Sequence, residues 1–191
     1  VAAIEARDAS TVSNLAGGTI EGAVVLSGAG SVLTNDGLVR LTGAGAQESR
    51  VNGDWVQSSG RLEVGLNDTL SVTGNMSLTG ELGLTLAAPT STAVIAVGGD
   101  LSLDATLDVS DGGGFSNGVY RLFDYGGSLS GGGLTIGSVA GNPRTEVQTA
   151  IAGQITLLVG DGNQMWDGSK TDANGTIDCR SGTYQGHTTN W

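Results

Sequence analysis

The first place to look for chemistry is a segment in which acidic residues are regularly spaced. Asp100, Asp104 and Asp108 are four residues apart in "DLSLDATLD", and an even spacing along a strand puts all three carboxylates on one face. Grouped carboxylates can bind Ca²⁺ or act as general acid and base in glycoside cleavage. The leucines between them would face a core, so we expect the aspartates to face solvent and to discourage edge-to-edge pairing of strands.

A second acid-rich stretch, "DGSKTDANGTID" at 167–178, is similar to a calcium-binding loop. Such a loop needs oxygen ligands at positions 1, 3 and 5, glycine at position 6 and an acid at position 12. With Asp172, Asn174 and Gly175 in register, positions 1 and 12 are Lys170 and Ser181. The register fails at two ligand positions, so we expect a turn rich in Asp, Asn and Gly that holds no metal.

The remaining reactive residues give no catalytic constellation. His187 is the only histidine, which excludes a multi-histidine metal site, and Cys179 has neither a disulfide partner nor a third member of a nucleophilic triad. The chain has no G-x-S-x-G elbow and no phosphate-binding glycine loop. Trp55, Trp166 and Trp191 could stack on sugars, but we expect Trp55 in the core. We therefore expect no catalytic residue, no metal and no cofactor.

The charge balance excludes further classes of partner. The formal net charge is −11, and the chain has only 8 lysines and arginines. A nucleic-acid binder needs a basic face that displaces counterions from phosphates, and attraction to an anionic membrane surface needs one too. We therefore expect no nucleic-acid partner, and we attribute the acidity to solubility.

Alternation of apolar and polar residues runs through most of the chain. Segments such as "GAVVLSG", "GLVRLTG" and "GQITLLV" show it, and it is the spacing of a strand whose alternate side chains face a core. The 34 glycines leave few windows for a helix, because each interior glycine costs a helix about 1 kcal/mol. The sequence predicts an all-β protein.

A repeat decides which kind of all-β protein to expect. The segment 70–84 matches 95–109 position by position, and 51–64 matches 70–84. A strand-only repeat of about 20 to 25 residues is typical of a parallel β-helix, in which inward side chains of successive coils stack. The expected core stack is Val72, Met76, Leu78, Val97, Leu101 and Leu103.

The number of coils and the competing fold follow from the same pattern. At about 22 residues a coil, residues 1–160 would make about seven coils. An antiparallel sandwich or barrel stays open as the alternative, because "NDG" at 35–37 and "SNG" at 116–118 are typical of hairpin turns. The registered repeat favours the β-helix.

The composition changes after residue 111. Residues 112–160 hold four of the five Phe and Tyr residues, including "GVYRLFDYGGSL" at 118–129, and "GQITLLV" follows at 153–159. These segments resemble the C-terminal end of autotransporter passenger domains, where G-x-Y-x-L-x-x-Y-x-G-x-L precedes a loop and a strand such as G-x-V-x-L-x-V. The trailing "MWDGSKTDANGTIDCRSGTYQGHTTNW" resembles the W-D-G…N-W motif beside α-proteobacterial passenger repeats.

The resemblance implies a right-handed parallel β-helix that is secreted through the outer membrane by a C-terminal β-barrel absent here. It divides the chain into regular coils (1–111), an aromatic-rich C-terminal cap (112–160) and a trailing segment (161–191) that packs on that end or starts a further repeat. Buried aromatic side chains would stabilise the cap and help it nucleate folding after secretion. The expected cap residues are Tyr120, Leu122, Phe123, Tyr125, Ile155 and Leu157.

The function expected from this resemblance is structural. The chain would be a fragment of a surface-displayed or secreted passenger whose turns at 43–49 and 86–93 contact a host-cell surface protein or glycan, or another copy of itself. The alternative is a β-helical polysaccharide lyase or hydrolase acting on acidic glycans. That alternative needs grouped basic residues, and Arg40, Arg50 and Arg61 are the only candidates.

Overall fold

The protein is a stack of β-strands in the part of the chain that the structure, a computed structural model, describes: residues 3–43 and 45–160. These residues form fifteen strands joined into one sheet system. No helix in this part is long and apolar enough to cross a membrane. Several sequence predictions lie outside the described residues: the trailing segment 161–191, the calcium-loop stretch 167–178, Trp166, Cys179, His187 and Trp191.

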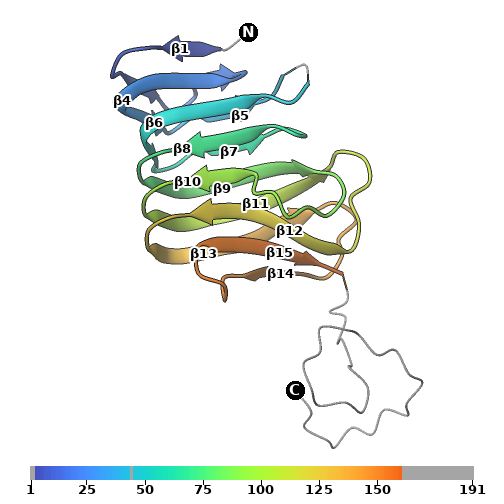
Figure 1. Cartoon of the computed structure of the whole chain (residues 1–191). Coiled ribbons are helices and arrows are strands. Elements are labelled where there is room, and N and C mark those ends of the chain that lie inside the picture. The colour runs from blue at the N-terminus through green and yellow to red at the C-terminus, as the bar shows by residue number, and fades with distance from the viewer. Residues whose placement is uncertain (1–2, 44, 161–191) are drawn as a thin grey trace, which may run out of the picture. The chain divides into compact units, whose positions relative to one another are not determined.

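Parallel pairing between successive coils builds three ladders, which we call A, B and C. Ladder A joins six segments in the order of the chain. They are β1 (Ile4–Ala6), the first part of β4 (Val24–Asn35), the first part of β6 (Glu48–Gln57), β8 (Thr69–Val72), β10 (Ile95–Val97) and β12 (Gly118–Tyr125). Figure 1 shows them one above another.

Ladders B and C follow the same order. Ladder B contains β2 (Thr11–Asn14), the second parts of β4 and β6, and the first parts of β9 (Met76–Leu86), β11 (Leu101–Asp111) and β13 (Leu129–Val139). Ladder C contains β3 (Thr19–Glu21), β5 (Leu38–Leu41), β7 (Arg61–Val64) and the second parts of β9, β11 and β13.

The parallel ladders confirm the predicted β-helix and show that the antiparallel sandwich was wrong for this chain. Six layers are joined by about five turns, whereas we expected about seven coils. Two features account for the difference. The connections at 87–94 and 112–117 lie outside the strands, and the last strands, β14 (Thr145–Gln148) and β15 (Gln154–Val159), are not coils: β15 pairs antiparallel with both β12 and β14.

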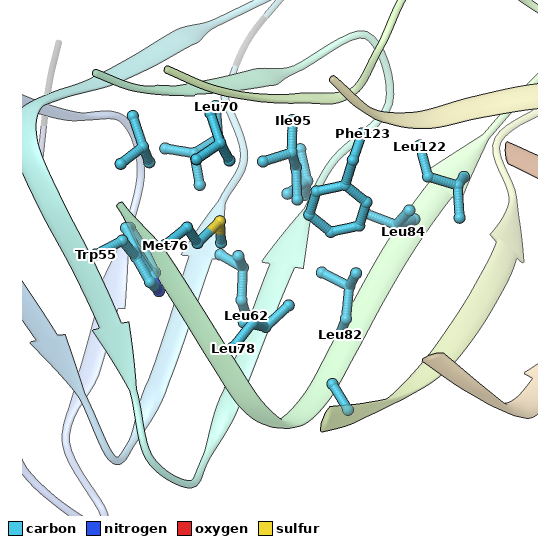
Figure 2. Packing of buried hydrophobic residues seen from close by; sticks show 14 of the residues in the cluster. Trp55, Leu62, Leu70, Met76, Leu78, Leu82, Leu84, Ile95, Leu122 and Phe123 are labelled. Atoms are coloured by element: carbon cyan, nitrogen blue, oxygen red, sulfur yellow. The ribbon is translucent and has the colours of Figure 1, made fainter. Parts of the chain in front are cut away.

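The inward positions of the ladders hold the hydrophobic core. Val72 pairs with Val97, Met76 with Leu101 and Leu78 with Leu103, in the register that the repeat predicts. Figure 2 shows side chains of all three ladders meeting in the interior. Trp55 pairs with Met76 and is 0% exposed, and its indole Nε1 is a buried donor without a partner. The sequence placed Trp55 correctly in the core.

One inward column is polar, and the repeat did not reveal it. Asn14, Asn35 and Gln57, which we call the amide column, are buried at the ends of their ladder B segments. The Nδ2 of Asn14 donates to Oδ1 of Asn35 over 2.8 Å, and the Nδ2 of Asn35 donates to Oε1 of Gln57 over 2.9 Å. The column then becomes aliphatic, because Gln57 pairs with Leu78.

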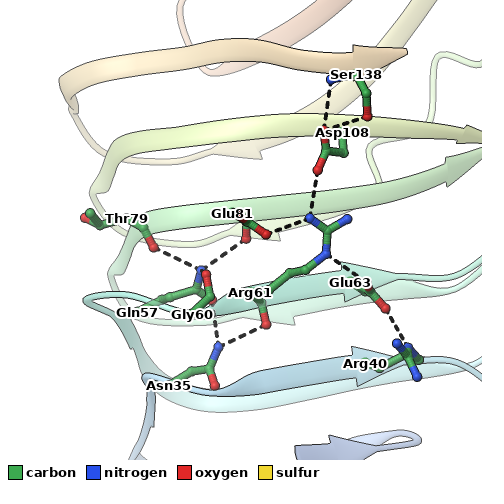
Figure 3. A network of polar contacts seen from close by, with 10 residues as sticks. All are labelled: Asn35, Arg40, Gln57, Gly60, Arg61, Glu63, Thr79, Glu81, Asp108 and Ser138. Atoms are coloured by element: carbon green, nitrogen blue, oxygen red, sulfur yellow. Dashed lines mark hydrogen bonds and ion pairs between the residues drawn. The ribbon is translucent and has the colours of Figure 1, made fainter. Parts of the chain in front are cut away.

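The amide column also satisfies backbone groups where ladder B turns into ladder C. The Nε2 of Gln57 donates to the carbonyl oxygens of Thr79 and Glu81 over 3.0 and 3.2 Å, and the Nδ2 of Asn35 donates to the carbonyl of Arg61 over 3.2 Å. Several of these contacts are drawn in Figure 3. Buried polar side chains of this kind are stable because their hydrogen bonds replace those to water.

Candidate binding edge at the loop corner

The connections from ladder C to the next strand of ladder A lie at one corner of the coils, which we call the loop corner. The first is only two residues long, at 22–23, and the longer ones are 42–47 (residue 44 lies outside the described residues), 65–68, 87–94 and 112–117. Figure 1 shows them on the same side of the molecule. The 65–68 connection is short and its neighbour 87–94 is long, so the coils differ most at this corner. Insertions on one side of a solenoid commonly form its binding surface.

Tyr120 fixes two of these connections to each other. Its side chain is buried, and its hydroxyl accepts a hydrogen bond from the backbone N–H of Ser116 over 2.9 Å. The same oxygen lies 3.1 Å from the carbonyl of Ala87 and 2.8 Å from that of Ser116. Phe115 packs on the Tyr120 ring with centroids 5.1 Å apart. Tyr120 therefore holds the connections 87–94 and 112–117 in place through its contacts with Ala87, Phe115 and Ser116.

A cavity of about 250 Å³ lies between the short connection 65–68 and the long connection 87–94 of the next coil. Its walls come from 65–69, from the end of β9 and from 87–94, with Tyr120 at one side. Asp68 lines the cavity and is only 5% exposed. Its Oδ1 accepts the backbone N–H of Gln47 over 2.7 Å, and no hydrogen bond from the described residues reaches its Oδ2. Leu66, at the same turn, is 36% exposed.

The outward side of ladder C carries ion pairs instead of a groove of free charges (Figure 3). Arg61 contacts Oε1 of Glu63 through Nε at 2.7 Å, and its Nη1 contacts Oε2 of Glu81 at 2.9 Å and Oδ2 of Asp108 at 2.7 Å. Arg40 pairs with the other oxygen of Glu63. We call Arg40, Arg61, Glu63, Glu81 and Asp108 the arginine network.

These contacts shift the pKa values of the groups involved. Hydrogen bonds from Arg61 and then from Ser138 lower the pKa of Asp108 and outweigh partial burial, which would raise it. Burial alone would raise the pKa of Glu63, but hydrogen bonds from Arg40 and Arg61 outweigh it and lower the pKa. Burial would lower the pKa of Arg61, and its bonds to Asp108, Glu63 and Glu81 reverse that effect and raise it. The network keeps its charges paired.

The three regularly spaced aspartates all face outward, and two of them connect coils. Asp100 is exposed, and its Oδ1 accepts the backbone N–H of Ser128 in the next coil over 2.7 Å. Likewise, Oδ1 of Asn75 in the preceding coil accepts the backbone N–H of Asp100 over 2.8 Å. Asp104 is exposed. Asp108 departs from the expected solvated face, because Arg61 covers it from two layers away.

The predicted cap residues lie in the last layer. Tyr120, Leu122 and Phe123 are 0% exposed, while Tyr125 is only partly buried. Ile155 and Leu157 reach the same core from β15, where Leu157 pairs with Tyr120 and Ile155 with Phe123. The structure therefore brings these six residues together. It also places Phe123 directly on Ile95, at the end of an aliphatic column.

The arrangement gives little support to glycan cleavage. Arg40 and Arg61 are paired with carboxylates, and Arg50 lies on ladder A, so the three arginines do not form one basic patch. Within residues 3–43 and 45–160, no group of three or more His, Cys, Asp or Glu side chains is placed to hold a metal ion.

Sequence reasoning missed the amide column, the arginine network and the cavity. The amide column had a signal: Asn14, Asn35 and Gln57 each stand a few residues before a glycine, at intervals of one coil. The arginine network had none, since its partners depend on which coils stack. The cavity depends on the different lengths of two neighbouring connections.

Comparison with known proteins agrees with the resemblance noted in the sequence. The chain is 38% identical over 133 residues to the "Adhesin BmaC autotransporter" of Brucella suis biovar 1 (strain 1330). The match covers 67% of this chain and 4% of that protein, so the chain spans a small part of its relative. No known family profile matches the chain, and no solved structure matches it. The chain is thus similar to a segment of an autotransporter adhesin, and its all-β solenoid fits an autotransporter passenger.

Proposed function

We propose that the chain is a non-enzymatic part of a surface-displayed or secreted passenger and that it contacts other surface molecules through the loop corner. The observation that carries this proposal is the gathering of the unequal connections at one corner of a regular solenoid. Strand pairing holds the coils in register, so loops on such a scaffold keep fixed positions relative to one another. The similarity to a protein named as an adhesin supports the same role.

The partner would be a host-cell surface protein or glycan, or a second copy of the chain. Such partners meet the protein outside the cell, on the bacterial surface or after release. The net charge of −11 disfavours non-specific adsorption to anionic surfaces, because like charges repel within the screening length of about 8 Å. Contact would therefore depend on the shape and hydrogen bonding of the loop corner.

We further propose that the C-terminal layer nucleates folding. A coil that forms on an existing end gains contacts that offset its loss of conformational entropy, whereas a lone coil has no such contacts. Buried aromatic side chains at Tyr120 and Phe123 remove more apolar area per residue than Val or Ala, and the antiparallel strand β15 covers the ladder A edge of this layer. A stable end of this kind would direct folding toward the N-terminus.

Adhesion is tested with the 191-residue chain attached to fluorescent beads and incubated with cultured host cells. Ser91→Arg places a bulky charge on the loop corner, and Ser130→Arg places the same residue on ladder B; both serines are exposed. We expect the wild-type and Ser130→Arg beads to adhere and Ser91→Arg beads to adhere several-fold less. Equal adhesion of both variants would show that the loop corner is not the contact surface.

Folding direction is tested with a matched pair of buried leucines. Leu122 lies in the last layer and Leu33 in the second, and both are 0% exposed. Each Leu→Ala change should cost about 2–5 kcal/mol. If the C-terminal layer forms first, Leu122→Ala slows refolding, whereas Leu33→Ala mainly speeds unfolding. Stopped-flow refolding measures both, and the reverse pattern would place the nucleus at the other end.

A further inference from the structure

We propose that the cavity at the loop corner binds one neutral, hydroxyl-rich ring, such as a terminal monosaccharide of a glycan. The inference rests on the proposed function, since it names the ligand class that an adhesive loop corner would recognise. It goes further by assigning the site to the space between 65–69 and 87–94.

The cavity lining combines polar groups, which can bind the hydroxyls of a sugar ring, with apolar groups, which can pack on its C–H face. The lining residues with polar side chains are Asp68, Asn67, Tyr120 and four threonines, Thr69, Thr85, Thr90 and Thr92. A hydroxyl can donate and accept, and an ionised carboxylate only accepts. A ring bearing several hydroxyl groups can therefore pair with both kinds of group.

The apolar part of the lining would meet the C–H face of the ring. Leu66, Leu86 and Val94 line the cavity together with three alanines, and Leu66 is one of four exposed large apolar residues in the described part of the chain. Binding sites typically combine such apolar walls with a small number of well-placed polar groups.

Charge and size narrow the ligand class. Neither arginine nor lysine lines the cavity, and Asp68 contributes its one carboxylate, so a phosphate, sulfate or carboxylate ligand would be repelled. The volume of about 250 Å³ lies just below the range of about 300–1,000 Å³ that is typical of drug-sized ligands. One ring fits this space, and the rest of a glycan would extend outward over the exposed loop.

Asp68 is the residue on which recognition should depend most. The Asp68 residue is only 5% exposed, and its Oδ1 accepts the Gln47 N–H. No hydrogen bond from the described residues reaches its Oδ2, so Oδ2 is the oxygen that would accept from a ligand hydroxyl. Hydrogen bonds to charged groups are among the stronger ones.

The test uses the 191-residue chain and three variants. Asp68→Asn keeps an acceptor for the Gln47 N–H but replaces the free oxygen with a donor, and Ala93→Leu fills the cavity. Asp104→Asn removes the same charge at an exposed position on β11, outside the cavity. Circular dichroism and thermal melting establish that each variant is folded.

Glucose, galactose, mannose and N-acetylglucosamine are titrated separately and followed by saturation-transfer NMR and by chemical shifts. We expect at least one to bind with Kd of about 1 mM, equivalent to about −4 kcal/mol. Asp68→Asn should weaken that binding at least tenfold, Ala93→Leu should abolish it, and Asp104→Asn should leave it unchanged.

The proposal fails if the folded wild-type chain binds none of these sugars, or if Asp68→Asn and Ala93→Leu both bind them like wild type. Ethylamine is titrated as a cationic probe, and binding of ethylamine without any sugar would also overturn the proposal. Adhesion of beads without sugar binding would leave the proposed function standing and remove only this inference. Sugar binding without adhesion would support this inference and contradict the proposed adhesive function.

Discussion

The guanidinium of Arg61 and the carboxylate of Asp108 lie 2.7 Å apart, although 47 residues separate them in the sequence. Arg61 is on β7 and Asp108 on β11, so the contact passes over the intervening coil of β9. That passage is open because Gly83 occupies the crossing point: a Cβ there would lie 2.6 Å from Nη2 of Arg61. The pair therefore links three layers of ladder C.

Acid should weaken the protein through this network. The pKa of Asp108 is lowered from its ordinary 3.8, and that of Glu63 from 4.5. A lowered folded-state pKa means that the unfolded chain binds protons first, so stability is complete above the ordinary values and is lost as the pH falls through the folded ones. The free energy of unfolding should decrease from about pH 5 toward pH 2.

Asp108→Asn isolates the contribution of Asp108. It should cost about 1 kcal/mol near pH 7, the upper range for a partly exposed pair, and flatten the acid loss of stability. Urea unfolding at several pH values measures both effects. Asp104→Asn is the control with an exposed carboxylate. An unchanged pH slope in Asp108→Asn would mean that this carboxylate has no folded-state partner in solution.

Two glycines of β13 should respond very differently to alanine. Gly131 and Gly133 both have positive φ angles, 93° and 85°, so each substitution carries a backbone cost of about 1–2 kcal/mol. A Cβ on Gly131 would also lie 2.1 Å from the carbonyl oxygen of Leu103, whereas one on Gly133 meets nothing within 4 Å. We expect Gly131→Ala to be the more destabilising.

Chemical unfolding of the two variants compares them directly. Because the two φ angles are alike, the difference between the variants reports the contact with the preceding coil. We expect Gly133→Ala to cost about 1–2 kcal/mol and Gly131→Ala to cost several kcal/mol or to prevent folding. Equal costs would mean that β13 is not packed on β11 as closely as the structure has it.

Asn35 should be the most sensitive member of the amide column. Its side chain accepts from Asn14 and from the N–H of Gly37, and donates to Gln57 and the carbonyl of Arg61. Asn35→Ala would leave several buried groups without partners, at about 1–3 kcal/mol each when no water replaces them.

We therefore expect Asn35→Ala to lower the free energy of unfolding by about 3 kcal/mol or more. Its outward neighbour Thr34 is the control, because its hydroxyl bonds only Ser13 and the carbonyl of Val12 at the surface, and Thr34→Val should change stability by about 0.5 kcal/mol or less. A loss in Asn35→Ala as small as that of the control would show that water enters the column.

The parts of this structure that the sequence predicts are those that repeat. Val72 and Val97 pair because the alternation and the glycine spacing recur at one offset, and that regularity is visible in the letters. Gln57 breaks it: the position holds an amide in one coil and Leu78 in the next, so a search for matching apolar residues passes over it. Partners such as Arg61 and Asp108 depend on coil stacking, which no local pattern encodes.

The C-terminal end of the described chain shows again that strand pairing cannot be predicted from local patterns alone. The aromatic composition of residues 112–160 predicts a cap, which stays a prediction. The antiparallel pairing of β15 with β12 was not predicted, because a strand that turns back has the same alternation as one that continues the coil. Likewise the turn at 86–93 was marked as a contact point, and its cavity was not, since the space depends on the shorter connection at 65–68.

Tyr120→Phe should loosen the loop corner while leaving the core intact. The ring stays and only the hydroxyl is lost, and with it the contacts to Ser116 and to the carbonyl of Ala87. The N–H of Ser116 loses its acceptor, so we expect a cost of about 1–2 kcal/mol. Hydrogen exchange should speed up at 87–94 and 112–117 and stay unchanged in β8 and β10, whose ladder A pairing does not involve the hydroxyl. Faster exchange in β8 and β10 as well would mean that Tyr120 supports the whole C-terminal end and does more than anchor the two connections.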